Sequence, residues 1–170
     1  LEDYSNILRN KKLELLERYI LDGLTTLLHK TDFIEKVKIN KETFEIKLFK
    51  GNDDEITKDM LSKGELQMYS TSIVQALAKT SGRPLPFMID TPLARLDEDH
   101  RKSLVGEFYP TASHQTIILS TDSEINYEHY KELKPYIAKS IVIAYDSVNG
   151  KTVLHDRYFF NNKGEKEIEV

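Results

Sequence analysis

The chain has 170 residues, of which 39% are hydrophobic and 31% are charged, and its formal net charge is -4. This length fits one globular domain with appendages, and no apolar run is long enough to span a membrane. The acidic charge argues against a wholly basic nucleic-acid-binding surface, and the absence of cysteine excludes disulfides and thiolate metal sites, as suits a cytoplasmic protein.

An amphipathic helix is predicted from about Asp3 to Lys30. Its apolar residues recur every three or four positions and so share one face: Leu13, Leu16, Ile20, Leu24, Leu27 and Leu28. The stretch from Asn10 to Lys12 is more polar, so we expect the first turns to project from the body of the protein. Judged from the residues alone, the helix either covers one side of a sheet or forms the root of a coiled coil.

Two runs of alternating apolar and polar residues follow, from Phe33 to Asn40 and from Thr43 to Lys50. They predict a β-hairpin that turns at Asn40-Lys41-Glu42 and places Phe44 in its second strand. Residues Gly51 to Asp54 form an acidic connection rich in turn residues.

The next predicted helix runs from Leu61 to Ser81 and begins near Ser62. Serine is a favourable N-cap, and Glu65 three residues later completes the capping-box pattern. Gly82 is expected to end the helix.

A strand-helix-strand unit is predicted from Leu85 to Leu119. Leu85 to Ile89 and Gln115 to Leu119 are short apolar runs typical of buried parallel strands, and Glu98 to Tyr109 fits a helix stopped by Pro110. This order indicates an α/β unit with two parallel strands and a right-handed crossover.

The last part of the chain alternates helix and strand signals. Tyr127 to Tyr136 is predicted to be helical, and Ser140 to Tyr145 and Lys151 to Arg157 are predicted strands on either side of a turn at residues 147–150. Residues 161–170 form a charged tail that we expect to be frayed.

Two positions in the α/β unit suit ligand binding. Ligands of such sheets collect beyond the carboxyl ends of the strands, and Asp90 and Thr121 lie at or just past two of those ends. A carboxylate at Asp90 can hold Mg²⁺ through retained water. The alternative is a turn-forming aspartate close to a proline.

The start of the second helix is the other candidate site. In Leu61-Ser62-Lys63-Gly64-Glu65, a serine and a glycine expose backbone N–H groups, and the helix dipole favours an anion there. One interpretation is a phosphate contact, and the other is an ordinary capping box with the same residues.

Together these motifs have the layout of ABC-type ATPases: a signature helix, a strand, a Walker-B aspartate, a proline, and a Leu-Asp that begins the D-loop. More narrowly, the sequence resembles the DndD family, the SMC-like ATPases of bacterial DNA phosphorothioation. The resemblance extends from about Leu61 to Phe160, whereas the first helix and the hairpin match only in kind. Five motifs carry it: Leu61-Ser62-Lys63-Gly64-Glu65-Leu66-Gln67, Ser81-Gly82-Arg83-Pro84-Leu85-Pro86, Ile89-Asp90-Thr91-Pro92-Leu93-Ala94-Arg95-Leu96-Asp97, His100-Arg101-Lys102 and Leu119-Ser120-Thr121-Asp122-Ser123-Glu124.

This resemblance implies an α/β fold, namely the C-terminal lobe of an ABC/SMC-type P-loop ATPase head with a mainly parallel sheet flanked by helices. Residues 1–30 would be the helix at the coiled-coil root. Residues 31–160 would be the ATPase lobe with its signature motif, Walker B and D-loop, and residues 161–170 the charged tail.

The resemblance also implies that the start of the second helix binds ATP. Ser62 and the amides near Gly64 would contact the γ-phosphate of ATP held by another head, and Lys63 and Glu65 belong to the same candidate set. Lys63 replaces the usual second glycine of the signature, so its ammonium either touches phosphate or points to solvent.

For the catalytic residues, the resemblance implies that Asp90 holds Mg²⁺ through water and that Asp97 lies on the D-loop at the paired interface. Thr91 and Thr121 are further candidates. They stand where ABC ATPases usually carry the glutamate that activates water and the switch histidine.

These two threonines leave several alternatives open. Threonine cannot act as a general base at neutral pH, so hydrolysis is either slow or served by another carboxylate, with Glu98 and Asp122 as candidates. The loss of both usual groups also motivates a non-catalytic head that serves complex assembly. An SMC- or RecN-like DNA repair ATPase is a separate alternative, and Arg83-Pro84-Leu85-Pro86 together with Thr91 and Thr121 favours the phosphorothioation family over it.

A phosphate loop is absent, because no Gly-x-x-x-x-Gly-Lys-Ser/Thr occurs in the sequence. The first residue is leucine, so we expect the C-terminal segment of a longer protein whose N-terminal Walker A lobe binds ATP. The resemblance implies as partners that lobe, a second head in an ATP-bound homodimer, other phosphorothioation-system proteins and DNA. The predicted function is ATP hydrolysis at the head-head interface in support of DNA phosphorothioate modification.

Overall fold

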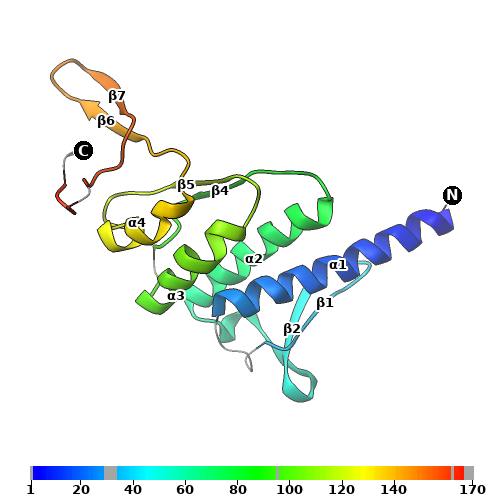
Figure 1. Ribbon diagram of the computed structural model, residues 1–170. Coiled ribbons are helices and arrows are strands. Elements are labelled where there is room, and N and C mark those ends of the chain that lie inside the picture. The colour runs from blue at the N-terminus through cyan, green and yellow to red at the C-terminus, as the bar shows by residue number, and fades with distance from the viewer. Residues whose placement is uncertain (1, 29–33, 95, 162, 167–170) are drawn as a thin grey trace.

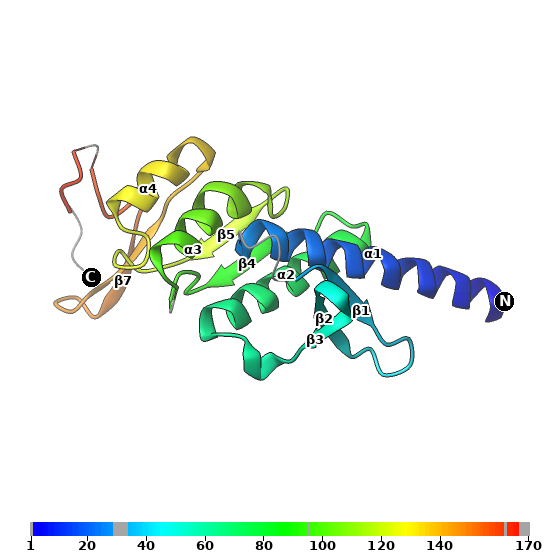
Figure 2. The same cartoon turned by 90° about the horizontal axis from the view of Figure 1, so that it is seen from below.

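Helix α1 (Glu2–Leu28) lies along helix α2 (Lys63–Ser81), and its N-terminal end extends beyond the body of the protein (Figure 1, Figure 2). The computed structural model describes residues 2–28, 34–94, 96–161 and 163–166, so the expected helix end at Lys30 lies outside the described residues. The predicted apolar face is confirmed by its buried residues: Leu13, Ile20, Leu24, Leu27 and Leu28. The exposure of Tyr4, Ile7 and Leu8 confirms that the first turns project.

A three-stranded antiparallel sheet lies beside α1 (Figure 2). Its strands are β1 (Lys36–Ile39), β2 (Ile46–Lys50) and β3 (Asp54–Ile56), in that order, which confirms the predicted hairpin. Glu17 of α1 attaches the sheet to the helix, because its Oε1 accepts from the backbone N–H of Ile39 at 2.8 Å. The sequence analysis missed β3, which is too short to show alternation.

The turns of this sheet also differ from the prediction. Phe44, expected in a strand, lies in the turn with a φ of 59° and 55% of its surface exposed. The turn is longer than Asn40-Lys41-Glu42 because the Phe44 N–H donates to the Asn40 carbonyl at 2.9 Å. After β2, Gly51–Asp53 form a short 3-10 turn, and Asp54 already belongs to β3.

Helix α2 begins and ends where the sequence predicts. Ser62 is its N-cap, and Glu65 completes the capping box. Gly82 ends the helix with a φ of 70°, in the left-handed region that glycine enters at the least cost. The capping box therefore sets the start of α2, and the glycine sets its end.

Replacing Gly23 with alanine is expected to destabilise the α1–α2 contact. A Cβ at this position would lie 2.9 Å from the Cβ of the buried Ser72, which is too close for either helix to accommodate without moving. We expect Gly23→Ala to lower the free energy of unfolding by about 1–3 kcal/mol, as measured by urea denaturation. Gly106 is the matched control: no described atom lies within 4 Å of its Cβ position, so Gly106→Ala should raise stability by about 0.5–1 kcal/mol.

The candidate site is built around a parallel pair of strands, β4 (Phe87–Asp90) and β5 (Thr116–Leu119). Phe87 pairs with Thr116 and Asp90 pairs with Leu119, so both strands end at the same edge. This confirms the predicted α/β unit and the parallel pairing. The remaining strands of the described chain form antiparallel sheets.

Burial of this pair differs from the prediction, because only one face is covered. Phe87 is buried and packs edge-on against Phe108, with ring centroids 5.8 Å apart, whereas Met88 is 61% and Leu119 46% exposed. Phe108 belongs to a helical segment made of α3 (Glu98–Ser103), a π-helical turn (Leu104–Phe108) and a 3-10 turn (Tyr109–Thr111). The helical segment therefore ends at Thr111 and not at Tyr109 as predicted, since proline is accepted in the first turn of the 3-10 segment.

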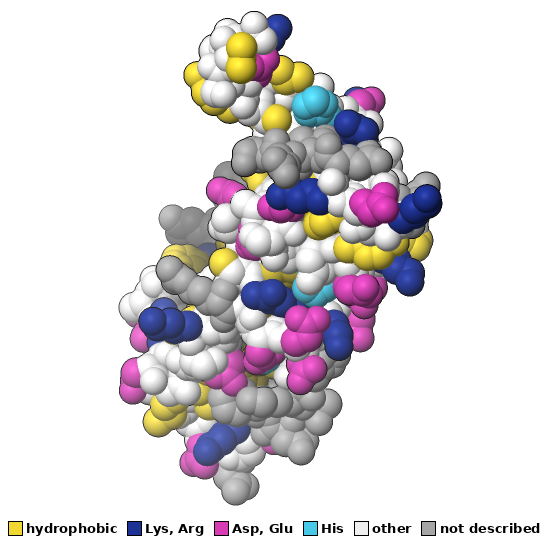
Figure 3. All heavy atoms as spheres, turned by 90° about the vertical axis from the view of Figure 1, so that its left-hand side faces the viewer, with side chains coloured by type: hydrophobic (Ala, Val, Ile, Leu, Met, Phe, Trp, Pro, Cys, Tyr) yellow, Lys and Arg dark blue, Asp and Glu magenta, His cyan; other side chains and the backbone are white. Residues whose placement is uncertain are grey.

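The C-terminal part adds helix α4 (Tyr127–Leu133), a 3-10 turn, and a hairpin of β6 (Val142–Asp146) and β7 (Lys151–His155), as predicted. The hairpin extends from the body in Figure 1, and Figure 3 shows hydrophobic side chains on it above a face where acidic and basic side chains are interspersed. None of the described helices is long and apolar enough to cross a membrane.

The tail is more ordered than predicted over the part that the structure describes. Phe160 pairs with Lys166, and the Asn161 N–H donates to the Glu165 carbonyl at 3.0 Å. Lys166 also forms an ion pair with Asp122, which attaches the tail to the loop after β5. Residues 162 and 167–170 lie outside the described residues.

Candidate functional site

The carboxyl ends of β4 and β5 bring three of the predicted residues together. Asp90 is the last residue of β4 and is paired with Leu119, the last residue of β5, and Thr121 follows two positions later. The backbone N–H of Thr91 continues this pairing by donating to the Leu119 carbonyl at 2.9 Å. Asp90, Thr91 and Thr121 therefore share one edge of the sheet, where α/β folds bind ligands.

The Asp90 side chain is exposed and has no hydrogen bond or ion pair with the described residues. No group of three or more His, Asp or Glu side chains among the described residues could hold a metal ion. Mg²⁺ at nucleotides is held by one or two protein ligands, by phosphate oxygens and by water. A single unengaged carboxylate at a strand end fits that ligand set.

Thr91 has an unusual backbone conformation. Its φ is 47°, a left-handed value that is an outlier for a β-branched residue, and the next residue is the buried Pro92. Such strain is retained only where the surroundings determine the conformation, and it is concentrated at functional sites. The Thr91 side chain is exposed at this edge, but its hydroxyl cannot serve as a general base at neutral pH.

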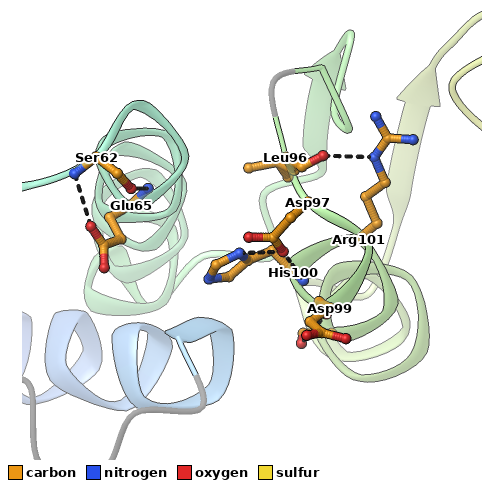
Figure 4. Close-up of polar contacts among 8 residues, drawn as sticks. Ser62, Glu65, Leu96, Asp97, Asp99, His100 and Arg101 are labelled. Atoms are coloured by element: carbon orange, nitrogen blue, oxygen red, sulfur yellow. Dashed lines mark hydrogen bonds and ion pairs between the residues drawn. The ribbon is translucent and has the colours of Figure 1, made fainter.

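The start of α2 is held by reciprocal hydrogen bonds (Figure 4). The Ser62 hydroxyl accepts from the Glu65 N–H at 3.2 Å, and the Glu65 carboxylate accepts from the Ser62 N–H at 2.8 Å. Glu65 is 8% exposed, so its carboxylate serves the cap here, while Ser62 and Lys63 are exposed and Gly64 is half-buried. The first N–H groups of a helix have no partner inside it, so this exposed end can receive an anion.

Asp97 has a similar capping role at the start of α3 (Figure 4). Its Oδ1 accepts from the His100 N–H at 3.0 Å, and the His100 Nδ1 lies 2.6 Å from the same oxygen. The bond from the His100 N–H lowers the pKa of the Asp97 carboxyl, which therefore stays ionised at neutral pH. Arg101 donates from Nε to the Leu96 carbonyl at 3.0 Å, so the backbone just before Asp97 is also held to α3.

Thr121 stabilises the loop after β5. Its hydroxyl lies 2.9 Å from the Ser123 hydroxyl and accepts from the Glu124 N–H at 3.3 Å. The hydroxyl is thus bonded within its own loop, although the residue remains exposed.

The two carboxylates considered as substitutes for a catalytic glutamate differ in their surroundings. Glu98 is exposed, and its Oε1 lies 3.4 Å from the Nε2 of the buried His129 without a hydrogen bond between them. Asp122 is bonded to Lys166, and this hydrogen bond lowers the pKa of the Asp122 carboxyl, which makes it a weaker base.

Two residues near the site were missed by the sequence analysis. Gln67 of α2 donates from Nε2 to the Pro92 carbonyl at 2.9 Å, and Glu124 accepts from the Leu93 N–H at 3.1 Å. Both lie inside motifs that we had singled out, but nothing in the spacing of the sequence pairs them with residues 92 and 93.

Comparison with known proteins identifies structures of similar fold. No protein-family model and no curated protein matches the sequence. Solved structures match in fold, and one from work on ATP-driven dimerization and DNA-stimulated activation of SMC ATPases is 15% identical, with a TM-score of 0.56 over 88% of this chain and 89% of that chain.

Two further structures extend this likeness. The SMC head domain from Thermotoga maritima is 15% identical, with a TM-score of 0.55 over 84% of this chain and 47% of that one. The Smc head domain with an extended coiled coil from Pyrococcus furiosus, bound to the C-terminal domain of ScpA, is 18% identical, with a TM-score of 0.58 over 91% of this chain and 39% of that one. The chain thus spans less than half of these two structures.

These likenesses show the fold of the chain, which is that of part of an SMC head domain. As expected, its α/β fold with an N-terminal helix fits the C-terminal lobe of such a head. The expectation of a mainly parallel sheet was wrong, because the described strands form three small sheets and only β4 and β5 are parallel.

Proposed function

We propose that this chain is the C-terminal lobe of an SMC-like ATPase that hydrolyses ATP between two engaged heads. The observation that carries the proposal is the SMC-type fold with an unengaged aspartate at the end of β4 and a capped, exposed helix start at α2. A lobe with a phosphate loop is required in addition, because this sequence contains none.

Each candidate residue has a distinct task in this mechanism. Bound Mg²⁺ would neutralise charge on the β- and γ-phosphates, and Asp90 would hold it through water. The Ser62 hydroxyl and the first N–H groups of α2 would bind the γ-phosphate of the nucleotide on the facing head, with the helix dipole in support. Lys63 is exposed beside Ser62 and would add positive charge there. Asp97 would fix the D-loop at the interface.

The water-activating group would not be Thr91. Thr91 has no basic group, and the ion pair with Lys166 makes Asp122 a weak base. Hydrolysis in this head would therefore rely on positioning and charge neutralisation and would be slow.

We further propose that the ATPase supports DNA phosphorothioate modification in bacteria and works with the other proteins of that system on DNA. The support is the motif resemblance to the DndD family between Leu61 and Phe160. The test is to delete the gene in its host and to measure phosphorothioate linkages in genomic DNA by mass spectrometry of nuclease digests. Unchanged phosphorothioate content would rule out this pathway and favour a RecN-like repair role.

The ATPase itself is tested by assembling this chain with an N-terminal lobe that carries the phosphate loop. Specific activity that rises with protein concentration in the presence of Mg²⁺ would support catalysis between two heads.

A specific observation favours one competing function, a non-catalytic head for complex assembly. Thr91 and Thr121 replace both usual catalytic groups, and the Thr121 hydroxyl is bonded within its own loop. Head association without ATP, together with no hydrolysis, would establish that competing function.

A further inference from the structure

The peptide group between Pro92 and Leu93 is held at both of its polar atoms. Its carbonyl accepts from Gln67 Nε2 at 2.9 Å, and its N–H donates to Glu124 Oε1 at 3.1 Å. Gln67 comes from the signature helix α2, and Glu124 comes from the loop after β5 that contains Thr121. Three segments that carry candidate site residues therefore meet at one peptide plane.

The position of this peptide group matters because it lies between Asp90 and Asp97. It follows the strained Thr91, and both Pro92 and Leu93 are fully buried, so the chain here cannot adjust by moving into solvent. Rotation of the peptide plane would break both hydrogen bonds at once. The two side chains thus determine the course of the segment that leads from the end of β4 to the D-loop.

Glu124 is an unusual choice for a purely structural contact. Its second carboxylate oxygen, Oε2, is buried and has no hydrogen-bond partner among the described residues. Burial and, to a smaller extent, the nearby charge of Glu124 raise the pKa of the Tyr109 hydroxyl, which is also buried and has no hydrogen-bond partner in the described part of the chain. A half-satisfied buried carboxylate is costly, and its presence in a native fold calls for a functional reason.

We propose that Gln67 and Glu124 are positioning residues that clamp the Pro92–Leu93 peptide and couple the signature helix and the loop after β5 to the D-loop. Engagement of the α2 start by a facing nucleotide would then be transmitted through Gln67 to the segment that carries Asp90 and Asp97. This deepens the proposed function and rests on it where hydrolysis is concerned. The clamp itself is a property of the chain alone.

The test uses Gln67→Met and Glu124→Met, which remove one bond each, and Glu124→Gln, whose amide oxygen can still accept from Leu93. In the head assembled with its N-terminal lobe, each Met variant should lower kcat about tenfold with the KM for ATP changed less than about twofold. The double variant should lose no more than either single one, because both break the same clamp. Glu124→Gln should keep kcat within about threefold of the wild type.

Gln75→Met is the matched control. Gln75 is a buried glutamine of the same helix, and its Nε2 donates at 3.3 Å to the carbonyl of Ala112, which is outside the segment from Asp90 to Asp97. Its loss should lower the melting temperature without changing kcat. If kcat fell as much in Gln75→Met as in Gln67→Met, any defect in α2 would slow the enzyme, and the proposed role of Gln67 as a positioning residue would be wrong.

A second readout separates the clamp from the ATPase proposal. Amide exchange of Leu93, followed by NMR on this chain alone, should be about tenfold faster in Gln67→Met, although Gln67 does not touch that N–H. If the wild-type head fails to hydrolyse ATP, the proposed function is wrong. The exchange measurement would still show whether Gln67 helps to hold the Pro92–Leu93 peptide. Unchanged Leu93 exchange in Gln67→Met would overturn the coupling.

Discussion

Replacing Asp90 with alanine is expected to abolish Mg²⁺-dependent ATP hydrolysis by the assembled head, with kcat reduced about 100-fold or more. Asp90 ends β4 at the edge of the parallel pair, is exposed, and has no partner among the described residues. Its loss would remove the charge that holds the metal near the phosphates, and the described chain has no acidic cluster that could replace it. The measurement is steady-state phosphate release over a range of Mg²⁺ concentrations.

The fold should not suffer from this change, because an exposed carboxylate without partners contributes little to stability. The free energy of unfolding of Asp90→Ala is therefore expected to lie within about 0.5 kcal/mol of the wild-type value. Asp99→Ala is the matched control, since Asp99 is also exposed and lies only nine residues further, on α3. If Asp90→Ala retained wild-type activity, or if Asp99→Ala lost as much, Asp90 would be a turn residue and not the metal ligand.

Much of the local structure could be predicted because its signals are local. The capping box of Ser62 and Glu65 and the glycine at 82 set the ends of α2, and the three-and-four spacing of leucines set the buried face of α1. These features depend on residues within one or two turns of each other. The edge shared by Asp90 and Thr121 is not local, but it could be predicted because a strand-helix-strand order places the carboxyl ends of two parallel strands at the same edge.

Features that depend on distant residues could not be predicted in this way. An apolar run predicts that a strand is buried, but it does not say which faces are covered, and Met88 and Leu119 are exposed on the open face of the pair. The contacts of Gln67 with Pro92 and of Glu124 with Leu93 join residues 25 and 31 positions apart. Only the packing of α2 against the segment after β4 brings them together, and no periodicity encodes that packing.

Placing a negative charge at Ser62 is expected to prevent ATP-driven association of two heads while leaving each head folded. Aspartate is as good an N-cap as serine, so Ser62→Asp keeps the acceptor that the Glu65 N–H uses at 3.2 Å. Its carboxylate would face the γ-phosphate of the opposite nucleotide, and opposed like charges should weaken association about 100-fold. The measurement is light scattering of the assembled heads with and without ATP and Mg²⁺.

Ser62→Ala separates the two roles of this residue. It removes the cap and should cost about 1 kcal/mol of stability, but it leaves the amides and the dipole of α2 free to bind phosphate. We therefore expect the alanine variant to be less stable and still to associate with ATP, and the aspartate variant to be stable and monomeric. The opposite pattern, with association following stability in both variants, would mean that the α2 start is only a helix cap and that the nucleotide binds elsewhere.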